Sequence, residues 1–161
     1  MKTTKNLFAI LAMSALAAIS GFGQAPEAKP APKYDAELAK KLGADERGMK
    51  MYVLCILKTG PKDAEFKGKE RDDIFAGHFA NINRLAGEGK LAVAGPFGKN
   101  DKTYRGLYVF NVSTIEDAEK LVVLDPAVKA GVFIPELTLW YGTAALMEVN
   151  SIHNKIAKPA K

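Results

Sequence analysis

Six periodic segments follow one another between residues 50 and 141, and their order is the strongest constraint on how this chain folds. Residues 69–88 and a segment opening at Ser113 have the 3.6-residue apolar period of helices. Four others have strand-like patterns: residues 50–58, 90–95, 104–112 and 132–141. The order βαββαβ predicts an α+β, ferredoxin-like domain, in which two helices cover one face of an antiparallel four-stranded sheet.

The opposite face of this sheet needs a cover. In residues 51–57 and 107–110 both alternating sets of side chains are apolar, whereas a sheet wetted on one side alternates apolar with polar residues. A second copy of the sheet is the simplest cover, which predicts a homodimer with a barrel-like core. The alternative is that the N-terminal and C-terminal segments of the same chain cover this face.

The segments outside the domain indicate export. Residues 1–23 have the basic start, the apolar stretch and the small residues before a cleavage site of a signal peptide. Residues 24–47 form a Pro/Ala/Lys linker followed by a short helix that begins after Asp35 and ends at Gly43. The domain spans residues 48–145, and residues 146–161 form a basic tail that we expect to be frayed. We therefore expect a periplasmic or secreted protein without a membrane-inserted part.

Charge and cysteine content limit the partners and the chemistry. The formal net charge is +5, yet the domain from residue 48 to residue 145 has 13 basic and 12 acidic side chains. Without a basic, aromatic-rich stretch, nucleic acid is not expected as a partner. Cys55 is the single cysteine, so no intrachain disulfide can form. Its apolar neighbours favour a buried residue over a nucleophilic or metal-binding thiol.

Two polar residues lie where apolar ones are expected. His78 falls in the middle of the apolar arc of residues 69–88, and Asp125 projects onto the apolar stripe of the second helix, just before Pro126. An imidazole or a carboxylate that is buried alone is costly. The economical inference is that the two groups serve each other or a ligand.

This pair suits general acid/base catalysis. His78 would be the base, Asp125 would fix its tautomer, and Asn81 and the turn at Gly95 and Pro96 would bind substrate. Structural roles remain open for His78 as a hydrogen-bonded core residue, for Asp125 as a cap or turn residue, and for Gly95 and Pro96 as a loop turn. The chain has no phosphate-binding, dinucleotide, nucleophile-elbow or zinc motif, so we expect neither a metal nor an organic cofactor. We expect His153, in the tail, to be solvated and without a role.

Three stretches in this order and spacing resemble the YCII-related family: HFANINRLAGEGKLAVAGPFG, GLYVFNVSTIEDAEKL and DPAVKAGVF. The resemblance covers residues 51–141. It implies a ferredoxin-like dimeric α/β barrel and an active site at His78 and Asp125, with Gly95 and Pro96 lining the pocket. One branch of that family is associated with removing chloride from a hydroxylated aromatic ring. The signal segment, the preceding helix and the Trp140/Tyr141 ending depart from its intracellular members.

The leading hypothesis from the sequence is an exported small enzyme of lyase or isomerase type that moves a proton on a small organic molecule. The alternative is a non-catalytic periplasmic protein of the same fold that binds a small ligand or has a structural role. A redox or metal protein that uses Cys55 is a third hypothesis, which requires a reactive thiol.

Overall fold

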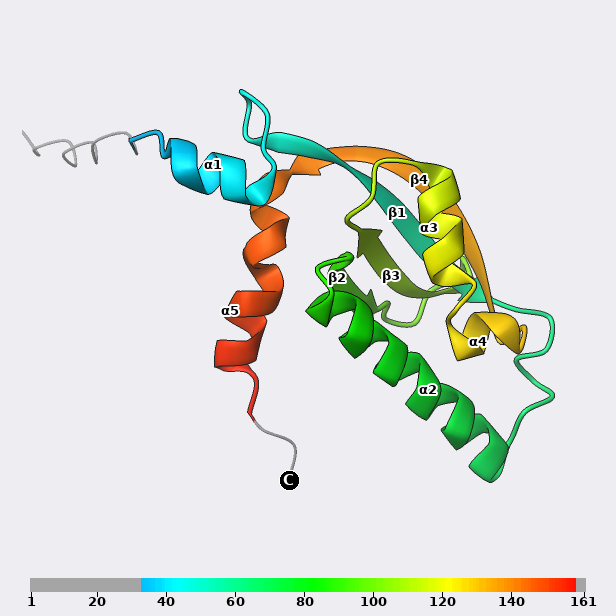
Figure 1. Cartoon of the computed structure of the whole chain (residues 1–161). Coiled ribbons are helices and arrows are strands. Elements are labelled where there is room, and N and C mark those ends of the chain that lie inside the picture. The colour runs from blue at the N-terminus through cyan, green and yellow to red at the C-terminus, as the bar shows by residue number, and fades with distance from the viewer. Residues whose placement is uncertain (1–32, 159–161) are drawn as a thin grey trace, which may run out of the picture. The chain divides into compact units, whose positions relative to one another are not determined.

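A computed structural model describes residues 33–158 of the chain (Figure 1). The chain divides into two units, Met1–Lys33 and Tyr34–Lys161, and the fold described below is that of the second unit. The predicted signal peptide and residues 24–32 of the predicted linker lie outside the described residues, as do residues 159–161. Between residues 33 and 158, no helix is long and apolar enough to cross a membrane.

The predicted ferredoxin-like α+β fold is confirmed. The sheet has the strand order β2-β3-β1-β4, and each neighbouring pair is antiparallel. Helix α2 lies against β2 and α4, and α3 lies against β4. The elements are α1 (Ala36–Leu42), β1 (Met49–Thr59), α2 (Gly68–Gly87), β2 (Leu91–Pro96), β3 (Tyr104–Phe110), α3 (Ile115–Val122), α4 (Pro126–Lys129), β4 (Phe133–Thr143), the 3₁₀ helix η1 (Ala144–Glu148) and α5 (Val149–Ile156).

Local sequence signals set most of the element ends. Asp35 caps α1 by accepting a hydrogen bond from the backbone N–H of Leu38, as the sequence predicts. Gly89 ends α2 with a φ of +69°, a left-handed conformation that favours glycine. The predicted start of α3 is wrong by one residue, because Thr114 and not Ser113 accepts the capping hydrogen bond, from the N–H of Asp117.

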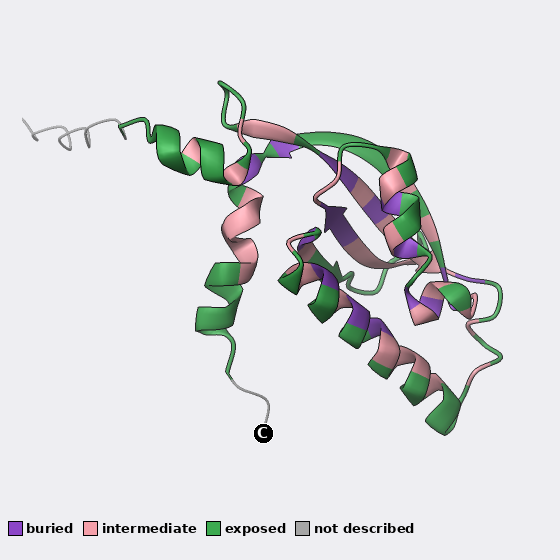
Figure 2. Ribbon diagram, in the orientation of Figure 1, coloured by how far each residue is buried: buried purple, intermediate pink, exposed green. Residues whose placement is uncertain are grey.

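The main core lies between the helices and one face of the sheet. Alternate residues of β1, namely Val53, Cys55 and Leu57, point to this side and are at most 1% exposed. In Figure 2 the buried residues follow β1 and β3 and the side of α2 that faces the sheet. Leu85 of α2 and Val122 of α3 complete this layer. The core therefore holds α2 and α3 at fixed positions against the strands.

The C-terminal segment covers part of the other face. Leu146 and Met147, on η1, pack against a second buried cluster of Tyr52, Ala92 and Val109. The expectation of a frayed tail is therefore wrong, because α5 follows η1 directly and Asn150 donates a hydrogen bond to the carbonyl of Leu91. The C-terminal segment of the same chain therefore covers this part of the sheet.

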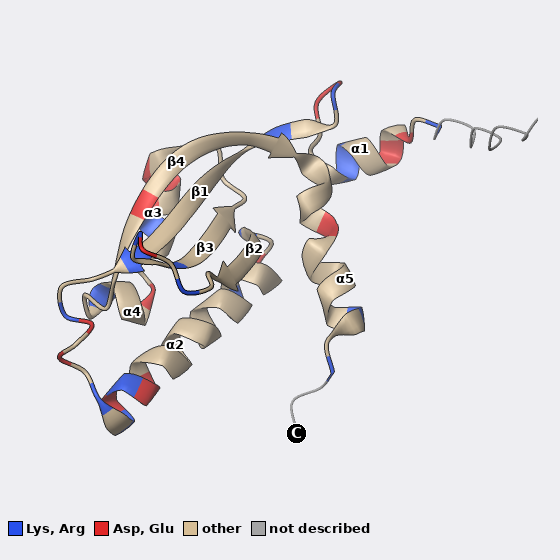
Figure 3. Cartoon of the chain, turned by 180° about the vertical axis from the view of Figure 1, so that it is seen from behind, with Lys and Arg blue, Asp and Glu red and all other residues tan. Residues whose placement is uncertain are grey.

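The rest of this face remains open. Ile56 and Leu107 are half-buried on it, and Ile134 of β4 is 48% exposed. Homodimer formation through this face stays a prediction. Figure 3 shows basic and acidic residues close together at the start of α2 and in the loops, which agrees with the nearly balanced charge of the domain.

Candidate active site

Helix α2 brings His78 into the core. The apolar residues Ile74, Phe75 and Ile82 on the same side of the helix pack on the main core, so the imidazole that lies among them is also turned inward. The residue is only 7% exposed. Its ring lies among aromatic rings, with centroid distances of 5.4 Å to Phe133 and 6.1 Å to Tyr108. The position predicted from the helical period is therefore the observed one.

Asp125 meets His78, although its placement differs from the predicted one. Helix α3 ends at Val122, and Asp125 is not on its stripe but is the N-cap of α4, where its Oδ1 accepts a hydrogen bond of 2.9 Å from the N–H of Ala127. Pro126 favours a helix start here, since proline fits the first turn. The carboxylate is fully buried and lies 2.8 Å and 3.0 Å from Nδ1 of His78. The capping role and the histidine-partner role therefore belong to the same residue.

Tyr108 is a third member of this group that the sequence reasoning missed. Its hydroxyl donates a hydrogen bond of 2.8 Å to Oδ2 of Asp125 and lies 3.3 Å from Nδ1 of His78. The signal was available, because a tyrosine in an apolar strand usually buries its ring and needs a partner for its hydroxyl. Burial and the charge of Asp125 raise the pKa of Tyr108 well above the usual range. The phenol therefore stays protonated and continues to donate.

The contacts define the tautomer of His78. Nδ1 faces an acceptor-only carboxylate, so we assign the ring proton to Nδ1. Nε2 is then the unprotonated nitrogen, and it is free of protein partners among the described hydrogen bonds. His78 also lines a cavity. His78 therefore offers a bound molecule in the cavity an unprotonated nitrogen, Nε2, which can accept a proton.

This cavity has a volume of about 610 Å³ and lies between α2, the end of β2, the first part of β3 and the start of β4. Gly95 and Pro96 line it, as predicted, and Arg105 adds a cation that the sequence reasoning did not single out. Most of the wall is apolar. Its aromatic members are Phe75, Phe79, Phe97, Tyr108 and Phe133.

Asn81 lies outside the lining of this cavity. Its side chain is buried, its Oδ1 accepts a hydrogen bond of 2.8 Å from Arg84, and its Nδ2 has no hydrogen-bond partner within residues 33–158. The structure therefore does not bring Asn81 together with His78 and Asp125 in the way that a substrate-binding role requires.

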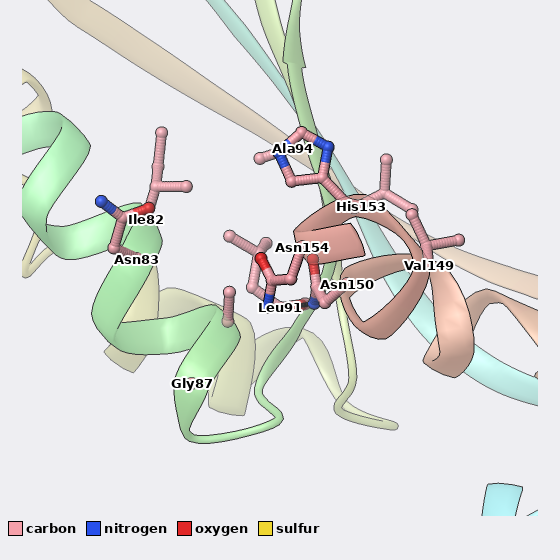
Figure 4. A pocket seen from close by; sticks show the side chains of 11 residues that line it. Ile82, Asn83, Gly87, Leu91, Ala94, Val149, Asn150, His153 and Asn154 are labelled. Atoms are coloured by element: carbon pink, nitrogen blue, oxygen red, sulfur yellow. Dashed lines mark hydrogen bonds between the residues drawn. The ribbon is translucent and has the colours of Figure 1, made fainter. Parts of the chain in front are cut away.

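A second cavity of about 380 Å³ adjoins the first and has α5 as one wall (Figure 4). Asn150, His153 and Asn154 of α5 line it opposite residues of α2 and β2. Ile82, Ala94 and His153 line both cavities. His153 is exposed, as expected for a tail residue, and it lines both cavities.

Cys55 is buried in the sheet behind this group. Burial, together with the negative charge of Asp125, raises the pKa of its thiol to about 12. A thiolate is the reactive form of cysteine, so Cys55 is unsuited to nucleophilic or redox chemistry at neutral pH. Among residues 33–158 no group of three or more His, Cys, Asp or Glu side chains is placed to hold a metal ion.

Comparisons with known proteins connect this geometry to a family. The profile of the YCII-related domain matches residues 51–140, which include His78, Tyr108 and Asp125 but neither α1 nor α5. A solved structure of the 5-chloro-2-hydroxyhydroquinone dehydrochlorinase of Burkholderia phenoliruptrix, in complex with 2,5-dihydroxybenzoquinone, is 22% identical with a TM-score of 0.38. The likeness covers 56% of this chain and 91% of that one. The search of curated proteins finds no match.

Proposed function

Because this chain belongs to the YCII-related domain family, we propose that it is a small exported enzyme of lyase or isomerase type, with His78 as its general base. One observation carries the proposal. Nδ1 of His78 is held by the buried carboxylate of Asp125, while the ring lines a cavity large enough for a small organic molecule.

The contacts around the carboxylate support proton transfer at Nε2. When Nε2 takes a proton from a bound molecule, the imidazolium that forms lies 2.8 Å from a carboxylate in a site without water access to that carboxylate. Tyr108 and the N–H of Ala127 hold the carboxylate in place. Returning the proton to another atom of the same molecule completes an isomerisation, and giving it to a leaving group completes an elimination.

The replacement His78→Gln tests the base directly. We expect turnover of any substrate found by screening small organic acids and ketones to fall by about 10²- to 10⁴-fold, the usual contribution of a general acid/base group. His153→Gln is the matched control, because His153 lines the same cavity without a carboxylate partner. A His78→Gln enzyme within about twofold of the parent would exclude His78 as the base.

The non-catalytic alternative predicts a different pattern. A binding protein would hold a ligand in the cavity without converting it, and His78→Gln would then change ligand affinity or stability only. Comparing ligand binding with product formation on the same samples separates the two functions.

We further propose that the open part of the sheet binds a second copy of this chain. The half-buried apolar residues of β1 and β3 there, Ile56 and Leu107, support this. Sedimentation should give a dimer for the parent and a monomer for Ile134→Lys, at micromolar concentration. Val123→Lys is a matched control, since Val123 is 51% exposed at the end of α3. A monomeric parent would contradict the proposal.

Export rests on the first 23 residues of the sequence. The test is the mass of the protein recovered from the extracytoplasmic fraction, which should correspond to a chain that begins at Gln24. A full-length chain retained in the cytoplasm would contradict this part of the proposal.

A further inference from the structure

Arg105 reaches the cavity because β3 is irregular. Gly106 pairs with Leu57 and Tyr104 pairs with Lys58, so Arg105 is left between them as the extra residue of a β-bulge. A bulge turns a side chain away from its regular direction. Here the guanidinium carbon lies 5.8 Å from the ring centroid of Phe133, on the wall of the His78 cavity.

Arg105 is the one cation of this cavity that is charged at every physiological pH, and no Asp or Glu lines the cavity wall among the described residues. The single described hydrogen bond of its side chain is a long one of 3.3 Å to Oδ2 of Asp63. Asp63 is already held by Arg71 through a side-chain contact of 2.7 Å and through its main-chain carbonyl. Two guanidinium groups thus share one carboxylate, and a net positive charge remains.

The rest of the wall is suited to a flat ring. Phe75, Phe79 and Phe133 lie around His78, with ring centroids of 5.9 Å, 5.4 Å and 5.4 Å from the imidazole. Aromatic walls favour flat apolar bodies over branched or strongly hydrated ones. His78 and Arg105 line the same cavity as these rings.

We propose that the His78 cavity binds an aromatic monocarboxylate, whose carboxylate is held by Arg105 and whose ring lies among the phenylalanines beside Nε2 of His78. The planar fork of the guanidinium matches the two oxygens of a carboxylate. A single net positive charge suits a monoanion better than a phosphate dianion. Asp63 is the internal competitor, because its Oδ2 accepts a hydrogen bond from one donor of Arg105.

This inference extends the proposed function by naming a substrate class, and it is tested without turnover. Benzoate and benzamide share a ring but differ in charge, so titrating each into the full-length mature protein, followed by NMR, isolates the contribution of the charge. We expect benzoate to bind about tenfold more tightly than benzamide, in line with a charge-assisted contact. Equal affinities for the two compounds would overturn the proposal. So would the absence of binding by either compound at about 10 mM, a concentration at which fragments of this size are expected to bind a matching site.

The variants assign the preference to Arg105. In Arg105→Gln benzoate should no longer bind more tightly than benzamide, and the affinity for benzamide should stay as it is in the parent. Lys120→Gln makes an equal change of charge on α3, and it should keep the tighter binding of benzoate. Asp63→Asn should raise the affinity for benzoate relative to benzamide, because Arg105 then no longer pairs with the Asp63 carboxylate. This variant tests the proposal even if Arg105→Gln folds poorly. An Asp63→Asn protein that binds benzoate no better than the parent would contradict the role of Asp63 as competitor.

His78→Gln separates this inference from the proposed function. We expect it to keep the preference for benzoate, since the carboxylate is bound by Arg105, while it loses any turnover. Loss of turnover with equal affinities for benzoate and benzamide in the parent would leave the base standing and overturn the carboxylate site.

Discussion

Replacing Asp125 by asparagine should separate catalysis from stability. The carboxylate accepts three hydrogen bonds, from Nδ1 of His78, from the hydroxyl of Tyr108 and from the N–H of Ala127. Asparagine keeps the oxygen that caps α4, and it is as good an N-cap as aspartate. Its amide nitrogen replaces the other oxygen and now donates. His78 must then present an unprotonated Nδ1, which moves the ring proton to Nε2.

The magnitude of the stability change follows from these contacts. Two charge-assisted hydrogen bonds, each worth about 1.5 to 3 kcal/mol, become neutral ones worth about 0.5 to 1.5 kcal/mol, so Asp125→Asn should lower the free energy of unfolding by about 2 to 3 kcal/mol. Asp125→Ala leaves three buried donors without an acceptor and removes the cap. Its cost should exceed about 4 kcal/mol.

Asp125→Asn should also lower activity, for a separate reason. Asp125→Asn places a proton on Nε2, so His78 can no longer act as a base, and we expect a loss of about 10²-fold or more although the protein remains folded. Urea unfolding measures stability, and long-range ¹H–¹⁵N correlation spectra of the imidazole report which nitrogen carries the proton. The reasoning is refuted if Nε2 stays unprotonated in Asp125→Asn, or if the alanine variant is as stable as the asparagine variant.

Three further predictions concern the surroundings of this site. Tyr108→Phe should cost about 1.5 to 3 kcal/mol in urea unfolding, because Asp125 loses a buried donor; a cost below about 0.5 kcal/mol would contradict that contact. Cys55 should resist thiol reagents at pH 8 until urea is added, because its thiol is buried and its pKa is raised. Between pH 9 and pH 12 the free energy of unfolding should fall by about 1.4 kcal/mol per pH unit, since the thiol loses its proton in the unfolded chain before it does so in the folded one. Cys55→Ala should reduce this slope. Deleting residues 149–161 should lower stability by less than about 1.5 kcal/mol, since α5 buries no residue and Asn150 provides one hydrogen bond; a larger loss in thermal unfolding would show that α5 belongs to the core.

Local patterns were sufficient for the framework of the fold. The apolar period of residues 69–88 predicts both the helix α2 and the inward position of His78, because helix geometry fixes which residues share a face. The start of α1 after Asp35 was equally readable, since capping depends on neighbouring residues. The βαββαβ order then leaves few ways to build an antiparallel sheet.

The site itself needed contacts between distant segments. Asp125 was predicted as the partner of His78 from a helical stripe that ends before it, and the capping of α4 is what actually orients its carboxylate. Tyr108 was missed because nothing in its strand indicates which distant side chain meets its hydroxyl. Arg105 was missed because the bulge that turns it appears only when β3 is paired with β1.

By itself the sequence determined the helices and strands of the βαββαβ domain, their order and the inward position of His78, because each of these depends on spacing within a few helical turns or strand residues. The tertiary structure decided that Tyr108, Asp125 and His78 form one hydrogen-bonded group, that Asn81 lies apart from it, and that α5 forms a wall of the adjoining cavity. These outcomes depend on the packing of segments that are 17 to 47 residues or more apart in the chain, and local spacing does not encode such distances.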